Sequence, residues 1–135
     1  MAVADLIRLL GVNPVYRNRI VYTETTEPVP PLYGALNAPL DETIESYLDQ
    51  NRIRLYSHQC EAVDHIRSGK NVIITTPTAS GKTLAFNIPV FERLESDTEA
   101  RALYLYPTKA LSNDQLATLE QMVQFTGIPA RPAIY

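Results

Sequence analysis

The residues with the clearest chemistry lie in one short stretch, Thr76-Pro77-Thr78-Ala79-Ser80-Gly81-Lys82-Thr83. The apolar, β-branched run Val72-Ile73-Ile74-Thr75 precedes it, and Leu84, Ile88 and Phe91 follow at the spacing of one helix face. A strand, a turn and a helix in this order are typical of a phosphate loop, in which backbone N–H groups and the positive end of the helix dipole bind anions. The sequence therefore predicts a phosphate-binding loop over residues 76–83.

Two side chains of this loop have expected roles. Lys82 would reach the β and γ phosphates of a nucleotide as a point charge and is the predicted catalytic residue, while the Thr83 hydroxyl would bind Mg²⁺. Gly81 would let the backbone approach the phosphates closely. The general pattern has glycine where Thr76 stands, and Gly-Lys-Thr alone is a weak signal. A plain turn from a strand into a helix with an exposed lysine is the alternative.

Three segments together resemble superfamily 2 helicases. Residues 76–83 resemble motif I of these proteins, which often carry alanine or threonine in place of the first glycine. The segment Leu55-Tyr56-Ser57-His58-Gln59 resembles their adenine-reading motif, with Gln59 placed 23 residues before Lys82. The segment Tyr106-Pro107-Thr108-Lys109-Ala110-Leu111-Ser112-Asn113-Asp114-Gln115 resembles motif Ia. The resemblance covers about residues 32–135 and points to the DEAD/DEAH-box-related branch with the bacterial mitomycin repair helicases and their fungal RecQ-like relatives.

The resemblance implies an ATP-dependent helicase with ATP and Mg²⁺ as cofactors and single-stranded DNA, rather than RNA, as the nucleic-acid partner. The nucleotide-binding residues would be Tyr56, Gln59, Thr76, Pro77, Thr78, Ala79, Ser80, Gly81, Lys82 and Thr83. The amide of Gln59 offers a donor and an acceptor to the adenine edge, and Tyr56 offers a ring face to the base. Pro107, Thr108 and Lys109 would contact the nucleic-acid backbone. Without the resemblance, Gln59 is a surface glutamine and Pro-Thr-Lys is only a turn into a helix.

Parts of the helicase machinery are missing from these residues. In the family, an Asp-Glu-x-His motif follows motif Ia, and a second RecA-like domain supplies an arginine; neither is recognisable here. Because phosphoryl transfer needs these groups together, we expect an amino-terminal fragment of a helicase that does not hydrolyse ATP by itself. The remainder of the helicase would be its partner. A non-catalytic nucleotide-binding module is the alternative. A small phosphate-loop kinase is less well supported, since only Arg93, Arg101 and Arg131 follow the loop, scattered singly.

The predicted fold class is α/β, a partial RecA-like domain of parallel strands with flanking helices. Strands are expected over residues 72–75, 102–106 and 130–135, with Leu103, Tyr104 and Leu105 buried in a parallel sheet. Helices are expected over 41–51, from a cap at Ser57 to Gly69, over 83–94, and over 110–125. Since ligands bind at the carboxyl ends of parallel strands, Thr76 and Pro107 should lie on one edge of the sheet.

An extension precedes this domain. Residues 1–40 are predicted to form an N-terminal extension with a proline-rich linker, and residues 41–135 the first part of the ATP-binding domain. Ala4 to Leu10 reads as a short helix, and Val15 to Thr23 as an exposed or edge strand. Arg17 and Arg19, which lie in this segment with Tyr16 and Tyr22, are better read as a solvated strand face than as a nucleic-acid patch.

Composition sets the remaining limits. The chain has 135 residues, 45% of them hydrophobic and 20% charged, which is normal for a globular domain. The net charge of −3 argues against binding nucleic acid through bulk positive charge, so any such contact must be local. The single cysteine, Cys60, excludes an internal disulfide and is expected to be a buried, inert thiol. His58 and His65 lack a third metal ligand. The start has no secretory signal, and we expect a cytoplasmic protein without a membrane partner.

Overall fold

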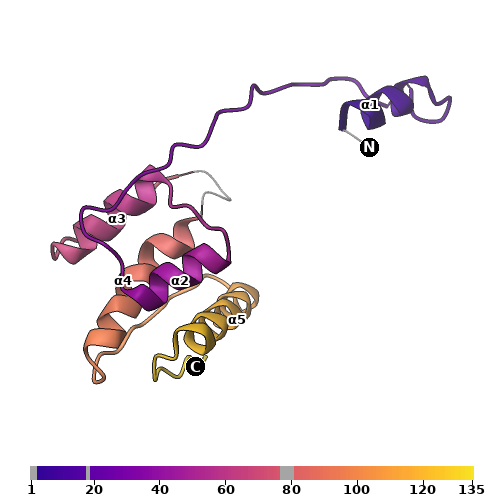
Figure 1. Ribbon diagram of the computed structural model, residues 1–135. Coiled ribbons are helices and arrows are strands. Elements are labelled where there is room, and N and C mark those ends of the chain that lie inside the picture. Colours follow the sequence, from indigo (N-terminus) through magenta and orange to yellow (C-terminus); the bar gives the residue numbers. More distant parts are fainter. Residues whose placement is uncertain (1–2, 18, 77–80) are drawn as a thin grey trace. The chain divides into compact units, whose positions relative to one another are not determined.

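The computed structural model describes residues 3–17, 19–76 and 81–135. The chain forms two compact units, Met1–Pro30 and Pro31–Tyr135. The first contains α1 (Val3–Val12), and the second contains α2 (Glu42–Gln50), α3 (Ser57–Arg67), α4 (Lys82–Ser96) and α5 (Lys109–Thr126) (Figure 1). Residues 31–40, which the sequence analysis grouped with the extension, lie within the second unit; the predicted domain limits of the helicase stay a prediction.

The first unit has a helix and a series of turns. The expected helix at Ala4 to Leu10 lies within α1 and is confirmed. The strand expected over Val15 to Thr23 is wrong for the described residues there. The Asn13 carbonyl accepts the N–H groups of Tyr16 and Arg17 at 3.0 and 2.9 Å, and its side-chain oxygen accepts that of Val15 at 2.9 Å. Local turn bonds at Asn13-Pro14 thus outweigh the β-branched composition.

The helices of the second unit follow local signals in the sequence. Asp41 is the N-cap of α2, as predicted, and Ile44 and Leu48 are its buried residues. The N-cap of α3 is Tyr56, one residue before the predicted cap at Ser57. Gly127, with φ +71°, ends α5 in the left-handed conformation that glycine adopts at low cost.

The core joins α2, α3, α4 and α5. Its buried residues are Ile44, Leu48, Val63, Ile88, Phe91, Leu119, Met122 and Ile128. Helix α3 packs along α4, and α2 packs against α5 (Figure 1). Pro89 lies inside α4 and is buried. No described helix is both long and apolar enough to cross a membrane. The packing fixes the start of α4, where the candidate phosphate loop ends, beside the start of α3.

Residues 72–75 and 102–106, where strands were expected, form neither a helix nor a strand ladder among the described residues. Their side chains still alternate, as in strands. Ile73, Leu103 and Leu105 are 90%, 81% and 84% exposed, while Tyr104 is half-buried and packs against Phe86 of α4. The expected burial of Leu103 and Leu105 is therefore wrong here, because the described residues cover only one face of each segment. The parallel arrangement stays a prediction.

Candidate nucleotide-binding site

The first turn of α3 meets the start of α4 through the side chain of Gln59. Its Nε2 donates a hydrogen bond to the Gly81 carbonyl at 2.6 Å, and its Oε1 accepts the Tyr56 N–H at 2.7 Å. The second bond belongs to the capping box of α3, which explains why a glutamine stands at this position of the helix. Gln59 is only 2% exposed. The structure thus brings the predicted adenine-reading residue against the predicted phosphate loop.

Gly81 is needed at this contact for two reasons. Its φ of +72° is in the left-handed region, which residues with a Cβ atom adopt at a cost. A Cβ atom added here would also lie 2.6 Å from Nε2 of Gln59. The same residue is the N-cap of α4, so its backbone geometry sets where that helix begins.

The described ends of the loop also contact one another. Lys82 is the first residue of α4, and its Nζ donates to the Thr76 carbonyl at 2.6 Å and lies 3.3 Å from Thr76 Oγ1. Pro77, Thr78, Ala79 and Ser80 lie outside the described residues. Thr83, half-buried, is the second residue of the helix. The first turn of α4 has no acidic residue, so the ammonium and the helix dipole together favour an anion there.

Tyr56 lies in a stack of side chains beside Gln59. Its ring is 5.4 Å from that of Tyr33 and 5.7 Å from that of His58, with interplanar angles of 10° and 12°. The Arg54 guanidinium lies 4.1 Å above the Tyr33 ring. Tyr56 is therefore packed against two other rings, so a base could reach its edge or replace one neighbour. Sequence reasoning missed Tyr33, because nothing local in Leu32-Tyr33-Gly34 identifies a partner so far along the chain.

The predicted nucleic-acid segment surrounds the start of α5. Pro107, Thr108 and Lys109 are all exposed. Thr108 is the N-cap of the helix, and its Oγ1 accepts the N–H of Leu111 at 3.3 Å. Lys109 is the first helical residue, where a charged side chain can reach solvent. The common sheet edge with Thr76 stays a prediction, since no ladder joins residues 72–75 to residues 102–106 among the described residues.

Burial perturbs three ionisable groups near these elements. Burial raises the pKa of the Cys60 thiol, and the Asp64 carboxylate raises it further. With 3% exposure, Cys60 is the buried thiol expected from the sequence. Burial also raises the pKa values of Tyr104 and Tyr106. All three groups are thus uncharged at neutral pH, and none of them has the lowered pKa of an activated nucleophile.

Comparison with solved structures gives the class of protein. The whole chain aligns with a crystal structure of the DUF1998 helicase MrfA bound to DNA, at 34% identity and a TM-score of 0.82. It also aligns over its whole length with MrfA bound to DNA and AMPPNP, at 33% identity and a TM-score of 0.80. In both cases it covers 19% of the solved chain. The fold is therefore helicase-like.

The family follows from the sequence. A family model described as DEAD/DEAH box helicase matches residues 56–135, and the chain belongs to this family, as the motifs predicted. Among its relatives is the uncharacterized ATP-dependent helicase YprA of Bacillus subtilis, 41% identical over 71% of this chain and 13% of YprA. Another is the ATP-dependent helicase hrq1 of Schizosaccharomyces pombe, 31% identical over 92% of this chain and 12% of hrq1. The chain thus spans a small part of the length of these relatives.

Proposed function

We propose that this chain is a nucleotide-binding part of an ATP-dependent DNA helicase and that it binds ATP with Mg²⁺. The observation that carries the proposal is the 2.6 Å hydrogen bond from Gln59 to the Gly81 carbonyl. It joins the motif expected to read adenine to the loop expected to hold the phosphates. Family membership and the AMPPNP named with the similar MrfA structure support ATP as the nucleotide.

Each side chain of the proposed site would bind a different part of the nucleotide. Gln59 uses one N–H and one lone pair in the structure, so its amide has one further donor and one further acceptor. Because Gln59 is 2% exposed, the adenine edge would reach them when a neighbouring side chain moves aside. Tyr56 would contact the base from beside it. The backbone of residues 76–81 would surround the phosphates, and Lys82 would exchange the Thr76 carbonyl for a phosphate oxygen. Thr83 would hold Mg²⁺, which neutralises phosphate charge when bound.

The segment Pro107, Thr108 and Lys109 would hold the nucleic-acid backbone. The exposed ammonium of Lys109 and the N-terminus of α5 offer positive charge to one phosphate. DNA as the partner is supported by the DNA-bound MrfA structures and by the Hel308 DNA helicases among the relatives. We expect Lys109→Ala to weaken binding of a single-stranded oligonucleotide and to lower its salt slope by about one. Unchanged binding would remove this assignment.

Hydrolysis would need groups supplied by further chain. The acidic motif and the second RecA-like domain of the family are not recognisable in this sequence, so the chain alone is expected to bind ATP without turning it over. The rest of the helicase is its proposed partner, and the cytoplasm its proposed compartment. Rapid turnover by this chain, lost in Lys82→Ala, would show that the chain is complete enough for catalysis.

Direct titration tests the nucleotide site. A fluorescent ATP analogue with Mg²⁺ is titrated into the chain, into Lys82→Ala and into the control Lys70→Ala, with circular dichroism of each. Lys70 lies beyond the end of α3 and is exposed, and its Nζ is 3.4 Å from Nδ1 of His65. We expect Lys82→Ala to weaken binding at least about tenfold, the effect of losing a charged hydrogen bond, and Lys70→Ala to leave it unchanged. A folded wild-type chain that binds no nucleotide would overturn the proposal.

A further inference from the structure

Residues 32–39, here called the strap, run beside α3 and begin by pairing with the residues at its start. The Gly34 N–H donates to the Leu55 carbonyl at 3.1 Å, and the Ser57 N–H donates to the Leu32 carbonyl at 2.9 Å. Between these bonds, Tyr33 and Tyr56 form an antiparallel bridge. Ser57 is the first residue of α3, so the strap satisfies one of the N–H groups that a helix start leaves unpaired.

Gly34 allows this close approach. A Cβ atom at residue 34 would lie 2.8 Å from the Ser57 Cα and 3.2 Å from the Cys60 Sγ. The first contact is to backbone, which cannot turn aside as a flexible side chain could. An alanine at this position therefore has to separate the strap from the start of α3, which carries both Gln59 and Cys60.

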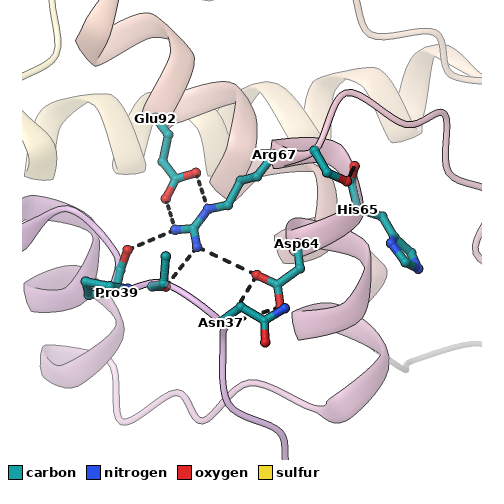
Figure 2. A network of polar contacts seen from close by, with 8 residues as sticks. Asn37, Pro39, Asp64, His65, Arg67 and Glu92 are labelled. Carbon is teal, nitrogen blue, oxygen red and sulfur yellow. Dashed lines mark hydrogen bonds and ion pairs between the residues drawn. The ribbon is translucent and has the colours of Figure 1, made fainter.

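The other end of the strap is bound by Arg67, in the last turn of α3. Its guanidinium donates to the carbonyls of Ala38 and Pro39 at 2.8 and 3.1 Å. On its other side it binds both carboxylate oxygens of Glu92 in α4, at 3.0 Å for Nε (Figure 2). Asp64 accepts the Asn37 N–H at 3.2 Å and forms an ion pair with Arg67 at 3.8 Å. The strap, α3 and α4 thus meet at one side chain.

The chemistry of this junction requires arginine. The planar guanidinium presents several N–H donors at fixed angles, and here they serve two carbonyls and a carboxylate, whereas a lysine ammonium is a single point charge. The side chains of Arg67 and Glu92 are 21% and 16% exposed, so water screens the pair little. The hydrogen bond to Glu92 raises the pKa of Arg67, which stays charged at every physiological pH.

The two junctions lie at opposite ends of α3 and hold the adenine side of the site in place. We infer that the strap positions Tyr56 and Gln59, and that Gly34 and Arg67 are positioning residues for the choice of base. Tyr33 of the strap packs on the ring of Tyr56. The inference rests on the proposed function, because it names the part of the chain that determines base selection at the proposed site.

The position of the strap can be measured without a nucleotide. Cys60 is the only cysteine, 3% exposed, and lies under Gly34. The rate of its modification by a thiol reagent therefore reports whether the strap is in place. We expect Gly34→Ala and Arg67→Lys to raise this rate at least about tenfold, as local opening does. The controls are Gly11→Ala, where a Cβ atom meets nothing within 4 Å, and Arg93→Lys, whose ion pair with Asp97 is 70% exposed at the arginine. Neither should change the rate.

Base selection is measured on the same variants as the ratio of affinities for ATP and GTP, each with Mg²⁺. We expect wild type to prefer ATP, and Gly34→Ala and Arg67→Lys to lower this preference about fivefold, the factor that one hydrogen bond contributes. Their dependence on Lys82 should persist, because the Lys82 ammonium is itself held by the Thr76 carbonyl. Circular dichroism establishes that each variant is folded, and either variant alone is sufficient for the test.

The outcomes separate the inference from the proposed function. Faster thiol modification together with a reduced preference for ATP supports the inference. It is overturned if both variants keep the wild-type preference, or if Cys60 reacts at the wild-type rate in both. Failure of the wild-type chain to bind either nucleotide overturns the proposed function itself. Binding without preference for ATP overturns the inference while leaving the phosphate site in place.

Discussion

Replacing Gly81 by alanine tests the contact that joins the two halves of the proposed site. Gly81 has φ +72° and would place a Cβ atom 2.6 Å from Nε2 of Gln59. Gly127 provides a matched control, because its φ is +71° and a Cβ atom there would meet nothing within 4 Å. Gly127→Ala therefore measures the backbone cost alone, and Gly81→Ala measures the same cost together with loss of the Gln59 contact.

The expected losses of unfolding free energy follow from the surroundings of these two glycines. A left-handed backbone costs a residue with a Cβ atom roughly 1–2 kcal/mol, so we expect Gly127→Ala to lower the free energy of unfolding by that amount. At residue 81 the Gln59 amide must also move and lose its bond to the carbonyl. A buried donor left without a partner costs about 1–3 kcal/mol, and Gln59 is 2% exposed. Gly81→Ala should thus cost about 2–5 kcal/mol in total.

Urea unfolding followed by circular dichroism measures both variants. The difference in unfolding free energy between Gly81→Ala and Gly127→Ala should largely vanish when Gln59 is alanine, because the Cβ atom at residue 81 then has no amide to displace. The double variant of Gly81 and Gln59 completes a thermodynamic cycle. The reasoning is refuted if Gly81→Ala and Gly127→Ala lower the unfolding free energy equally in the wild-type background. It is also refuted if Gln59→Ala leaves the excess cost of Gly81→Ala unchanged.

Two further predictions concern α5 and the segment before it. Thr108→Ala should destabilise the chain by about 1 kcal/mol through loss of the N-cap bond to Leu111, and Thr108→Ser should retain most of it, measured as urea midpoints; equal midpoints for alanine and serine would argue against the cap. Among the described residues, the buried Tyr104 hydroxyl has no hydrogen-bond partner, and burial raises its pKa. Folding therefore favours the protonated Tyr104 hydroxyl. The free energy of unfolding keeps its full value below the ordinary tyrosine pKa of about 10 and falls as the pH rises above it. Tyr104→Phe should reduce this alkaline loss, and an unchanged profile of unfolding free energy against pH would contradict the assignment.

The helices were predictable because their signals are local. Asp41 before Ile44 and Leu48, and Gly127 after Met122, mark boundaries and buried faces that the structure confirms. The family was predictable for a different reason: three motifs at fixed spacing form one chemical pattern. The spacing of Gln59 and Lys82 predicted that the adenine motif and the loop belong together, and the hydrogen bond to Gly81 is consistent with it.

What the sequence did not predict depends on long-range contacts. The proline-rich approach to residue 32 predicted an extended linker, whereas Gly34 and Arg67 bind residues 32–39 to α3 through contacts up to 29 residues apart. The stacking of Tyr33 on Tyr56 was not predicted for the same reason, because it also joins residues far apart in the sequence. The strand expected over Val15 to Thr23 was wrong because residue composition does not supply a partner strand, and hydrogen bonds to Asn13 form turns there instead.

Photochemical labelling with an ATP analogue that carries an azide on the adenine ring tests whether the starts of α3 and α4 form one nucleotide site. After irradiation with Mg²⁺ present, we expect covalent label on residues 54–60, around Tyr56 and Gln59, and its loss in the presence of excess ATP or in Lys82→Ala. Label on α1 or α5, or label on residues 54–60 that ATP does not prevent, would contradict the claim that the start of α3 and the start of α4 form one nucleotide site.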